Sequence, residues 1–524
     1  MAPSSAPAKP TTGSLLALTA PRTALLYIAA LTGITLLGLA VRLYGLTSYG
    51  IWFDEAYHIQ LVKLPTLEEM LGAVLSNPPS DPLYTLLLRA WTGLFGYEDG
   101  AIRMLSVLLS TATLPATYWL GTVLIGRAAG LIGALLLALS PYAVEFGQEA
   151  ALYALASLLT TLAVAAGLRW RAAGKGRLTY LILGILAIYT SYVVAVILAL
   201  FALLTLVQGR DEAKVAKRDW LTINFAIFAA WLPWLIALVL NWVMSAQPRA
   251  TLTHYATPAE VFGALVQFSS GSATLLQRQW VWAGLALVAS AGLLVASLLA
   301  ARRTHNTNVQ AIAIISAAIF LVPAVVSAAS GLWLFIPHFM LFLLPSIFVL
   351  IGGGWSPGLA TIEAEGKPRK WLEAGRRTSA GLLGLWLVAQ VGGLALFYRY
   401  PPHGADGLRE IAALLRSRGE EVRDVYVTPP ALTPTLQQYY SGSLQGLPVS
   451  FDLRSIYLPY DPPAWNAQSL KTLESSIEPA SKFWLVYRPE LDEDGRFMQT
   501  LKSRYKLLER HQYEYAGLYL FQTP

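Results

Sequence analysis

The segment from Ile51 to His58 (IWFDEAYH) sets two adjacent carboxylates, Asp54 and Glu55, among aromatic side chains. An apolar run over residues 22–44 ends shortly before it and has about the 20 residues that a helix needs to cross a bilayer. A carboxylate at this low-dielectric boundary is harder to ionise than one in water, which suits a group that takes up a proton. The motif predicts acid–base chemistry at a membrane surface, and the alternative is a pair of solvated loop acids. Of the two carboxylates, Asp54 is favoured as the base.

Two further acidic positions fall in connections that we predict on the same side of the membrane. Asp81 follows a loop signal (NPPS), and Glu149 stands at a junction between two apolar segments. Glu149 could instead be a favourable charge at a helix start, and Asp81 before a proline has the same ambiguity. A carboxylate here can remove a proton from a hydroxyl or amine while cations stabilise a leaving phosphate. Glycosyl transfer from a lipid phosphate fits those demands.

Several cations could contact such a phosphate. Arg103, at the predicted external start of an apolar segment, is a candidate, and its alternative role is to reach lipid headgroups. His338 could bind phosphate when protonated or merely hydrogen-bond a backbone carbonyl. The remaining candidates for the donor site are His58, Lys63 and Arg89.

No spacing of potential ligands in the sequence indicates a metal site. A divalent cation held by Asp54, Asp81 or Glu149 is an open alternative. The absence of cysteine excludes disulfides, thiolate metal sites and a cysteine nucleophile. The net charge of +7 comes from basic residues in short loops between apolar segments, with no basic stripe, so no nucleic-acid partner is expected.

The composition predicts a polytopic membrane protein, because 55% of the residues are hydrophobic and only 13% are charged. About eleven spans are expected, within a range of about 10 to 13. They fall near residues 22–44, 101–125, 128–146, 150–168, 178–190, 191–208, 220–243, 280–300, 310–329, 337–353 and 379–398. The division between the fifth and sixth is placed at Tyr189–Tyr192, and 81–96 is expected to be an interfacial helix or an additional half-span.

Basic residues gather in alternate connections, which predicts a cytoplasmic N-terminus, with Asp54 and Glu55 outside. We therefore expect a disordered cytoplasmic tail (1–21), an all-α transmembrane domain (22–399) whose external loop 45–100 carries the acid motif, and a small soluble extracytoplasmic α/β domain (400–524). In the last domain, helices are predicted at 405–419 and 494–506, and strands at 424–429, 483–489 and 515–522. The spans are rich in Ala, Leu and Gly and the chain has no cysteine, which is compatible with a bacterial inner-membrane protein.

Four motifs in order over residues 41–160 resemble the GT-C glycosyltransferases of the protein O-mannosyltransferase and lipid A aminoarabinose transferase type. They are WFDEAYH, PLYTLLLRAWTGLFG, AIRMLSVLLSTATLPATYWLG and GRAAGLIGALLLALSPYAVEFGQEAALYAL. The resemblance implies an integral membrane enzyme that moves a sugar, with inversion, from a polyprenyl-phosphate carrier on the external face. It also implies that Asp54 is the catalytic residue, Glu55 its partner, and Glu149 with Tyr153 the second acidic motif.

Two positions depart from that pattern. Ala151 stands where the second motif often has arginine, and His338, in Pro337-His338-Phe339, replaces the arginine of a late motif. One charge-assisted contact to phosphate contributes about 1.5–3 kcal/mol, so these changes mean either an altered donor site or lost activity. Loss of these arginines makes a non-catalytic membrane subunit that binds a partner the alternative to an enzyme, and a transporter is a separate, lesser alternative. The sugar stays open, and the acceptor could be a protein, a lipid or a polysaccharide.

Overall fold

The computed structural model describes most of the chain. The described ranges are 21–76, 82–208, 214–244, 255–270, 280–331, 334–355, 369–400, 407–418, 424–428, 432–446, 474–475, 477, 481–489, 495–513 and 516–524. Asp81 and the predicted tail, apart from Pro21, lie outside these ranges.

The described chain is helical up to Arg399. Its helices are α1 (Pro21–Leu43), α2 (Phe53–Val62), α3 (Leu67–Ser76), α4 (Pro82–Phe95), α5 (Asp99–Leu124), α6 (Arg127–Leu139), α7 (Pro141–Gln148), α8 (Tyr153–Ala173), α9 (Arg177–Ile188), α10 (Tyr192–Gln208), α11 (Lys217–Met244), α12 (Pro258–Ser270), α14 (Trp280–Arg303), α15 (Thr307–Ser330), the 3₁₀ helix η1 (Pro337–Leu343), α16 (Leu344–Gly353) and α18 (Arg369–Arg399).

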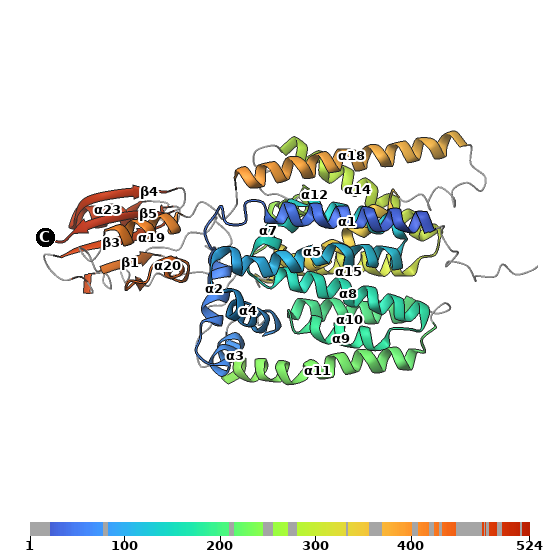
Figure 1. Ribbon diagram of the computed structural model, residues 1–524, viewed down its shortest axis with the longest axis horizontal. Helices are drawn as coiled ribbons and strands as arrows, with labels where there is room; N and C mark the ends of the chain where they lie inside the picture. The colour runs from blue at the N-terminus through green and yellow to red at the C-terminus, as the bar shows by residue number, and fades with distance from the viewer. Residues whose placement is uncertain are drawn as a thin grey trace, which may run out of the picture.

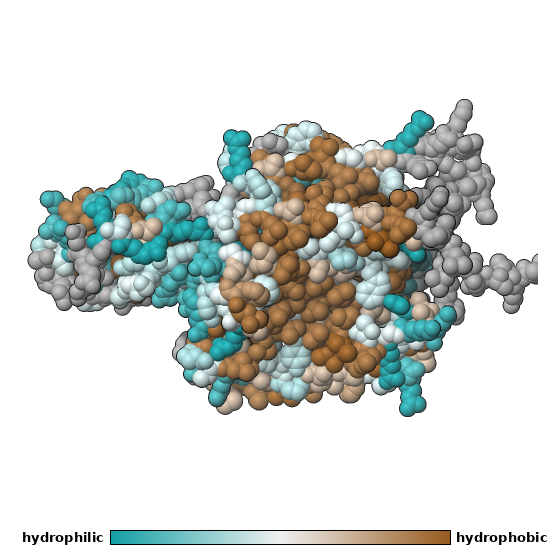
Figure 2. Space-filling model, in the orientation of Figure 1, coloured by the Kyte–Doolittle hydropathy of each residue, from teal (hydrophilic) through white to brown (hydrophobic). Residues whose placement is uncertain are grey.

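Seven of these helices are long and apolar enough to cross a membrane, and the bent pair α6–α7 makes an eighth candidate. Large apolar side chains remain exposed along them, as at Leu26 of α1 and Phe225 of α11. Figure 2 shows hydrophobic residues covering the visible face of the helical bundle, whereas hydrophilic residues gather on the C-terminal region. The protein is therefore an integral membrane protein with several spans.

Two expectations about the spans can be compared with the helices. Residues 178–208 form two separate helices, α9 and α10, as the division at Tyr189–Tyr192 predicts. The span expected at 128–146 corresponds to two helices, α6 and α7, which together are long and apolar enough to cross a membrane but meet at 62°. Ser140 caps α7 and Pro141 begins it. Proline has no N–H to donate to the carbonyl four residues earlier, so α6 ends there.

Helix α5 lies at the centre of the first half of the bundle and packs against α1, α6, α7 and α8. It meets α6 at a close approach, where a Cβ added to Gly121 would overlap the backbone of Gly130. Small residues at such a crossing let two helices pack backbone to backbone. This contact fixes α6, and hence the turn into α7, relative to α5.

The C-terminal region is a mixed α/β sheet, as predicted. The strand order is β2-β1-β3-β5-β4, in which β1 runs parallel to β2 and β3, and β5 runs antiparallel to β3 and β4. Helices cover both faces: α19 and α20 share one apolar cluster with the sheet, and α23 shares the other. The elements are α19 (Leu408–Ser417), β1 (Asp424–Thr428), α20 (Thr433–Tyr439), β2 (Gln445–Gly446), β3 (Lys482–Tyr487), α23 (Arg496–Arg504), β4 (Lys506–Gln512) and β5 (Gly517–Gln522).

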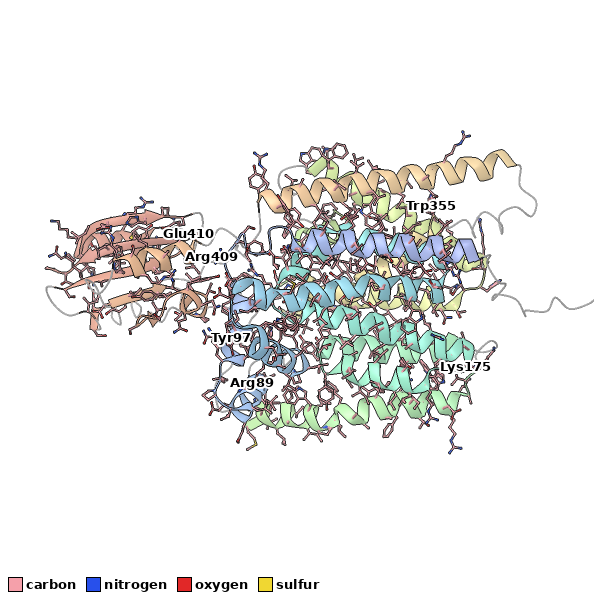
Figure 3. The ribbon with its side chains drawn as sticks, viewed as in Figure 1. Arg89, Tyr97, Lys175, Trp355, Arg409 and Glu410 are labelled. Carbon is pink, nitrogen blue, oxygen red and sulfur yellow. The ribbon has the colours of Figure 1, made fainter. Side chains whose placement is uncertain are left out.

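The long helices of the bundle run side by side, and the C-terminal sheet lies beyond one of its ends (Figure 1). Helices α2, α3 and α4 gather at that same end, and α2 packs against both α4 and α20. Helix α4 confirms the helix expected at 81–96. In Figure 3, Tyr97 and Arg409 mark the end that faces the sheet, while Lys175 and Trp355 lie toward the opposite end. The acid motif thus lies where the membrane bundle meets the C-terminal domain.

Candidate active site

Glu55 forms a fully buried ion pair with Arg103, and both side chains have 0% exposure. Two hydrogen bonds of 2.7 Å join them, from Arg103 Nε to Glu55 Oε1 and from Nη2 to Oε2. Glu55 Oε2 also accepts the backbone N–H of Trp52 at 3.1 Å, which caps the start of α2. A buried carboxylate with this number of donors is held in one position.

Arg103 also holds the chain that precedes the acid motif. Its Nη1 donates to the carbonyls of Leu46 (2.8 Å) and Tyr49 (3.0 Å), and its Nη2 donates to Gly50 (2.7 Å). Together with Glu55, these contacts use all five N–H groups of the guanidinium. The expectation that Arg103 contacts a donor phosphate therefore does not fit the geometry, because its hydrogen-bonding capacity is used within the protein.

Asp54 follows Phe53 at the N-terminus of α2 and is half-buried, whereas Glu55 beside it is fully buried. Its Oδ2 accepts a hydrogen bond from the hydroxyl of Tyr153 at 3.1 Å. A helix N-terminus favours a negative charge, so the position suits an ionised carboxylate. Two neighbouring acids thus have different settings: Glu55 points into the protein, and Asp54 keeps partial access to the surroundings.

Tyr153 connects Asp54 to His338, although the two lie far apart in the sequence. The rings of Tyr153 and His338 meet edge to face, with centroids 5.3 Å apart. Phe146 contacts both rings, at 4.9 Å from Tyr153 and 5.9 Å from His338. The structure therefore brings together three of the residues singled out from the sequence: Asp54, Tyr153 and His338.

A cavity with about 310 Å³ of empty space, part of it open, adjoins this group. It lies between α5, α6, α7, α8 and η1–α16. Its lining residues are Ser110, Thr113, Leu137, Ala143, Phe146, Gly147, Tyr153, Ala154, Ser157, Leu341 and Leu344. Because Tyr153 contributes to the wall and also bonds Asp54, the carboxylate lies next to a recess within the bundle that has both polar and apolar lining residues.

Glu149 is the last polar residue before the turn into α8 and is only 2% exposed. Burial, followed by the negative charges of Glu145, Glu55 and Asp54, raises the pKa of Glu149 well above its ordinary value. The neighbouring Ala150 N–H donates to Glu55 Oε1 at 3.0 Å. The two acidic motifs are therefore in direct contact, and Glu149 favours its protonated form.

The structure gives His58 a different setting from the one expected of a phosphate ligand. It is 4% exposed, and its ring packs against those of Tyr57 and Tyr84. Burial lowers the pKa of His58 to about 3, so the ring is neutral at ordinary pH. A neutral imidazole has no charge to offer a phosphate.

Arg89 and Lys63 lie at the other end of α2. Arg89 donates to the carbonyls of Leu64 (2.7 Å) and Pro65 (3.0 Å), just beyond the end of that helix. Lys63 donates to Gln438 of α20 at 2.9 Å. The expected contact of Lys63 and Arg89 with the donor phosphate does not fit these positions, because both cations serve the local packing of α2.

Sequence reasoning missed Arg42, which is fully buried at the end of α1. It donates to Ser110 Oγ at 2.8 Å and to the carbonyls of Leu137 and Ala138 at 3.2 and 3.4 Å. These carbonyls end α6, where Pro141 supplies no N–H. Ser110 and Leu137 line the cavity, so Arg42 lies behind its wall. The position of an arginine near the end of an apolar run was the available signal.

Among the described residues, no group of three or more acidic or histidine side chains is placed to hold a metal ion. The suggested set of Asp54, Asp81 and Glu149 cannot be assessed as a whole, because Asp81 lies outside the described ranges.

The chain has the GT-C membrane glycosyltransferase fold. It is similar to the ArnT apo structure from Cupriavidus metallidurans (TM-score 0.61, 13% identity, 95% of this chain and 98% of that one). The same protein with bound undecaprenyl phosphate gives a TM-score of 0.58 at 13% identity, over 96% and 98% of the two chains. The oligosaccharyltransferase AglB from Archaeoglobus fulgidus, in complex with an inhibitory peptide and a dolichol-phosphate, gives 0.55 at 11% identity, over 95% and 74%. No family model and no curated protein sequence matches the chain.

Proposed function

We propose that this protein is a membrane glycosyltransferase that moves a sugar from a polyprenyl-phosphate donor to an acceptor hydroxyl or amine. The observation that carries the proposal is the division of roles between two adjacent acids. Glu55 is fixed by Arg103 inside the protein, while Asp54 is half-exposed, hydrogen-bonded to Tyr153 and next to a cavity. The fold, shared with structures that contain undecaprenyl phosphate or dolichol-phosphate, supports a lipid-linked donor.

In the proposed reaction, the acceptor oxygen or nitrogen attacks the anomeric carbon of the sugar as its proton passes to Asp54. The bond from that carbon to the phosphate oxygen breaks, and the phosphate leaves with the bonding electrons, which inverts the anomeric centre. Tyr153 orients the Asp54 carboxylate, and Glu55 positions α2 beneath it. Burial favours the protonated form of Glu149, which lies beside Ala150, the residue whose N–H binds Glu55.

His338 is the proposed cation for the donor phosphate, since it lies against Tyr153 next to the cavity. A protonated imidazole has two N–H donors for phosphate oxygens. Ala151 is 1% exposed in the turn between Glu149 and α8, where it leaves no room for a larger side chain without repacking. An altered donor site centred on His338 therefore accounts for both departures from the motif pattern.

We also propose eleven crossings with a cytoplasmic N-terminus in a bacterial inner membrane. The seven long helices, the bent pair and the three shorter apolar helices Arg177–Ile188, Tyr192–Val207 and Met340–Gly353 together match that number. The domain limits 22–399 and 400–524 fit the change from helices to mixed sheet. On this topology the cavity, Asp54 and the C-terminal domain all face outward.

The test is release of polyprenyl phosphate by purified protein supplied with a panel of polyprenyl-phosphate sugars and an acceptor extract. Asp54→Asn should reduce release by at least about a hundredfold, the usual loss for a general base. Asp219→Asn, which changes an exposed acid in the first turn of α11, is the matched control and should retain activity. Unchanged release by Asp54→Asn would refute the role of this residue. No donor binding across the panel would favour a non-catalytic subunit.

A further inference from the structure

The chain before the acid motif, residues 45–52 (here the acid loop), is held from two opposite directions. From the membrane bundle, Arg103 binds three of its carbonyls. From the C-terminal domain, Arg409 of α19 donates to Thr47 O at 3.1 Å and to Tyr49 O at 2.9 Å. Tyr49 O thus accepts from Arg103 and from Arg409. Figure 3 shows Arg409 on the side of the sheet domain that faces the bundle.

Tyr439, at the end of α20, makes a second connection to the acid loop. Its hydroxyl oxygen accepts the backbone N–H of Ile51 at 2.7 Å and donates to Asp99 Oδ2 at 2.7 Å. The same Asp99 oxygen also accepts from Arg409. Asp99 begins α5, the helix that carries Arg103. The acid loop, the start of α5 and two elements of the C-terminal domain therefore share one hydrogen-bonded network.

The opposite end of α2 is tied to the same domain. Gln438 donates to Tyr97 O at 2.9 Å and accepts from Lys63 at 2.9 Å, and Lys63 is the residue that follows the last residue of α2. The helix that carries Asp54 is thus connected to α20 before its first turn, through Ile51, and after its last turn, through Lys63. Both ends of a helix of 10 residues are connected to a domain about 380 residues further along the chain.

We propose that the C-terminal domain is part of the catalytic apparatus, with Arg409 and Tyr439 as positioning residues that set the place of Asp54. Ile51 lies three residues before Asp54 at the start of α2, so a shift at the Ile51–Tyr439 hydrogen bond moves the carboxylate. Displacing a catalytic group by about 1 Å is enough to lower turnover about a hundredfold. The inference rests on the proposed transferase function only where turnover is measured.

The experiment compares Tyr439→Phe and Arg409→Ala with the controls Tyr440→Phe and Arg418→Ala. Arg418 pairs with Glu509 inside the C-terminal domain, and Tyr440 packs in the apolar cluster of α19 and α20. Hydrogen exchange of residues 46–55 is measured by mass spectrometry, which requires no substrate. Both test variants should exchange about tenfold faster there, and both controls should match the wild type.

Turnover supplies the second readout. Each test variant should lose about tenfold in kcat with donor KM within about twofold, because the donor cavity is unchanged and only the acid is displaced. Arg409→Lys, which keeps one donor to the loop, should recover part of the loss. Unchanged exchange at 46–55, or faster exchange with wild-type kcat, would overturn the proposal.

Two further outcomes are distinguishable. If the wild type turns over no donor, the proposed function fails, while the exchange data still decide whether the domain holds the acid loop. If Arg409→Ala also exposes β1 and β3 to exchange, that domain has unfolded, and Tyr439→Phe, which removes a single oxygen, decides the question.

Discussion

The backbone N–H of Ala150 donates to Glu55 Oε1 at 3.0 Å, an oxygen that also accepts from Arg103 Nε at 2.7 Å. One buried carboxylate thus joins α2, α5 and the turn that begins α8. Asp54 comes from the first of these segments, and Tyr153, its hydrogen-bond donor, from the last. The position of Asp54 relative to Tyr153 therefore depends on Glu55, the residue next to Asp54.

Glu55→Gln should destabilise the protein strongly. The amide nitrogen would have to face an N–H of Arg103, Trp52 or Ala150, and the Arg103 charge would stay buried without its partner. Breaking one side of such a pair costs about 3–5 kcal/mol. Thermal unfolding in detergent measures the loss. Glu509→Gln, in a partly exposed pair with Arg418, is the control and should change the unfolding temperature little. Equal effects of the two substitutions would contradict the assignment.

Tyr153→Phe should lower turnover while the fold is kept. The phenyl ring retains the packing against Phe146 and His338, but the hydrogen bond to Asp54 Oδ2 is lost. A hydrogen bond to a charged group contributes about 1.5–3 kcal/mol, so kcat should fall by about 10- to 100-fold. Steady-state polyprenyl phosphate release is the measurement. Tyr189→Phe, which loses a hydroxyl bond to Ala230 O, is the matched control and should keep wild-type kcat.

Arg42→Met should reduce stability because the carbonyls of Leu137 and Ala138 would lose their donor inside the bundle. Each unsatisfied buried carbonyl costs about 1–3 kcal/mol. Unfolding temperature in detergent is again the readout, with Arg169→Met on the exposed side of α8 as the control. A wild-type unfolding temperature for Arg42→Met would show that α6 ends without help from this side chain.

His58 should make folding sensitive to acid. Its pKa of about 3 in the folded state is lower than the ordinary value of about 6.5, so between these values the unfolded chain binds the proton and the folded one does not. Stability is lost as pH falls below about 6.5, by about 1.4 kcal/mol per pH unit. His58→Phe should flatten this dependence. Unfolding temperatures of both proteins from pH 7.5 to 5 provide the check, and parallel curves would contradict it.

The sequence was sufficient for the class of fold and for the helices and strands, because these depend on local pattern. Apolar runs of helical length and alternating strands predicted the bundle and the sheet, and aromatic residues around Asp54 indicated its setting. The roles of the cations could not be predicted this way. Arg103 and Arg409 bind backbone carbonyls of the acid loop. Every residue has a backbone carbonyl, so the sequence does not indicate which carbonyls accept these hydrogen bonds. The same holds for Tyr439, whose partner Ile51 lies 388 residues away.

The two sets of bonds on the acid loop become possible at different stages of biosynthesis. Glu55 and Arg103 are 48 residues apart, so their pair can form while the first helices enter the membrane. The contacts from Arg409 and Tyr439 reach back across 360 and 388 residues, so they cannot form before the segment that contains these two residues has been synthesised. In a nascent chain that ends before residue 400, we expect the ion pair between Glu55 and Arg103 to be formed. The hydrogen bonds from Arg409 and Tyr439 to the acid loop would still be missing. The order of synthesis would thus keep the acid loop from being held on both sides until the C-terminal domain has emerged.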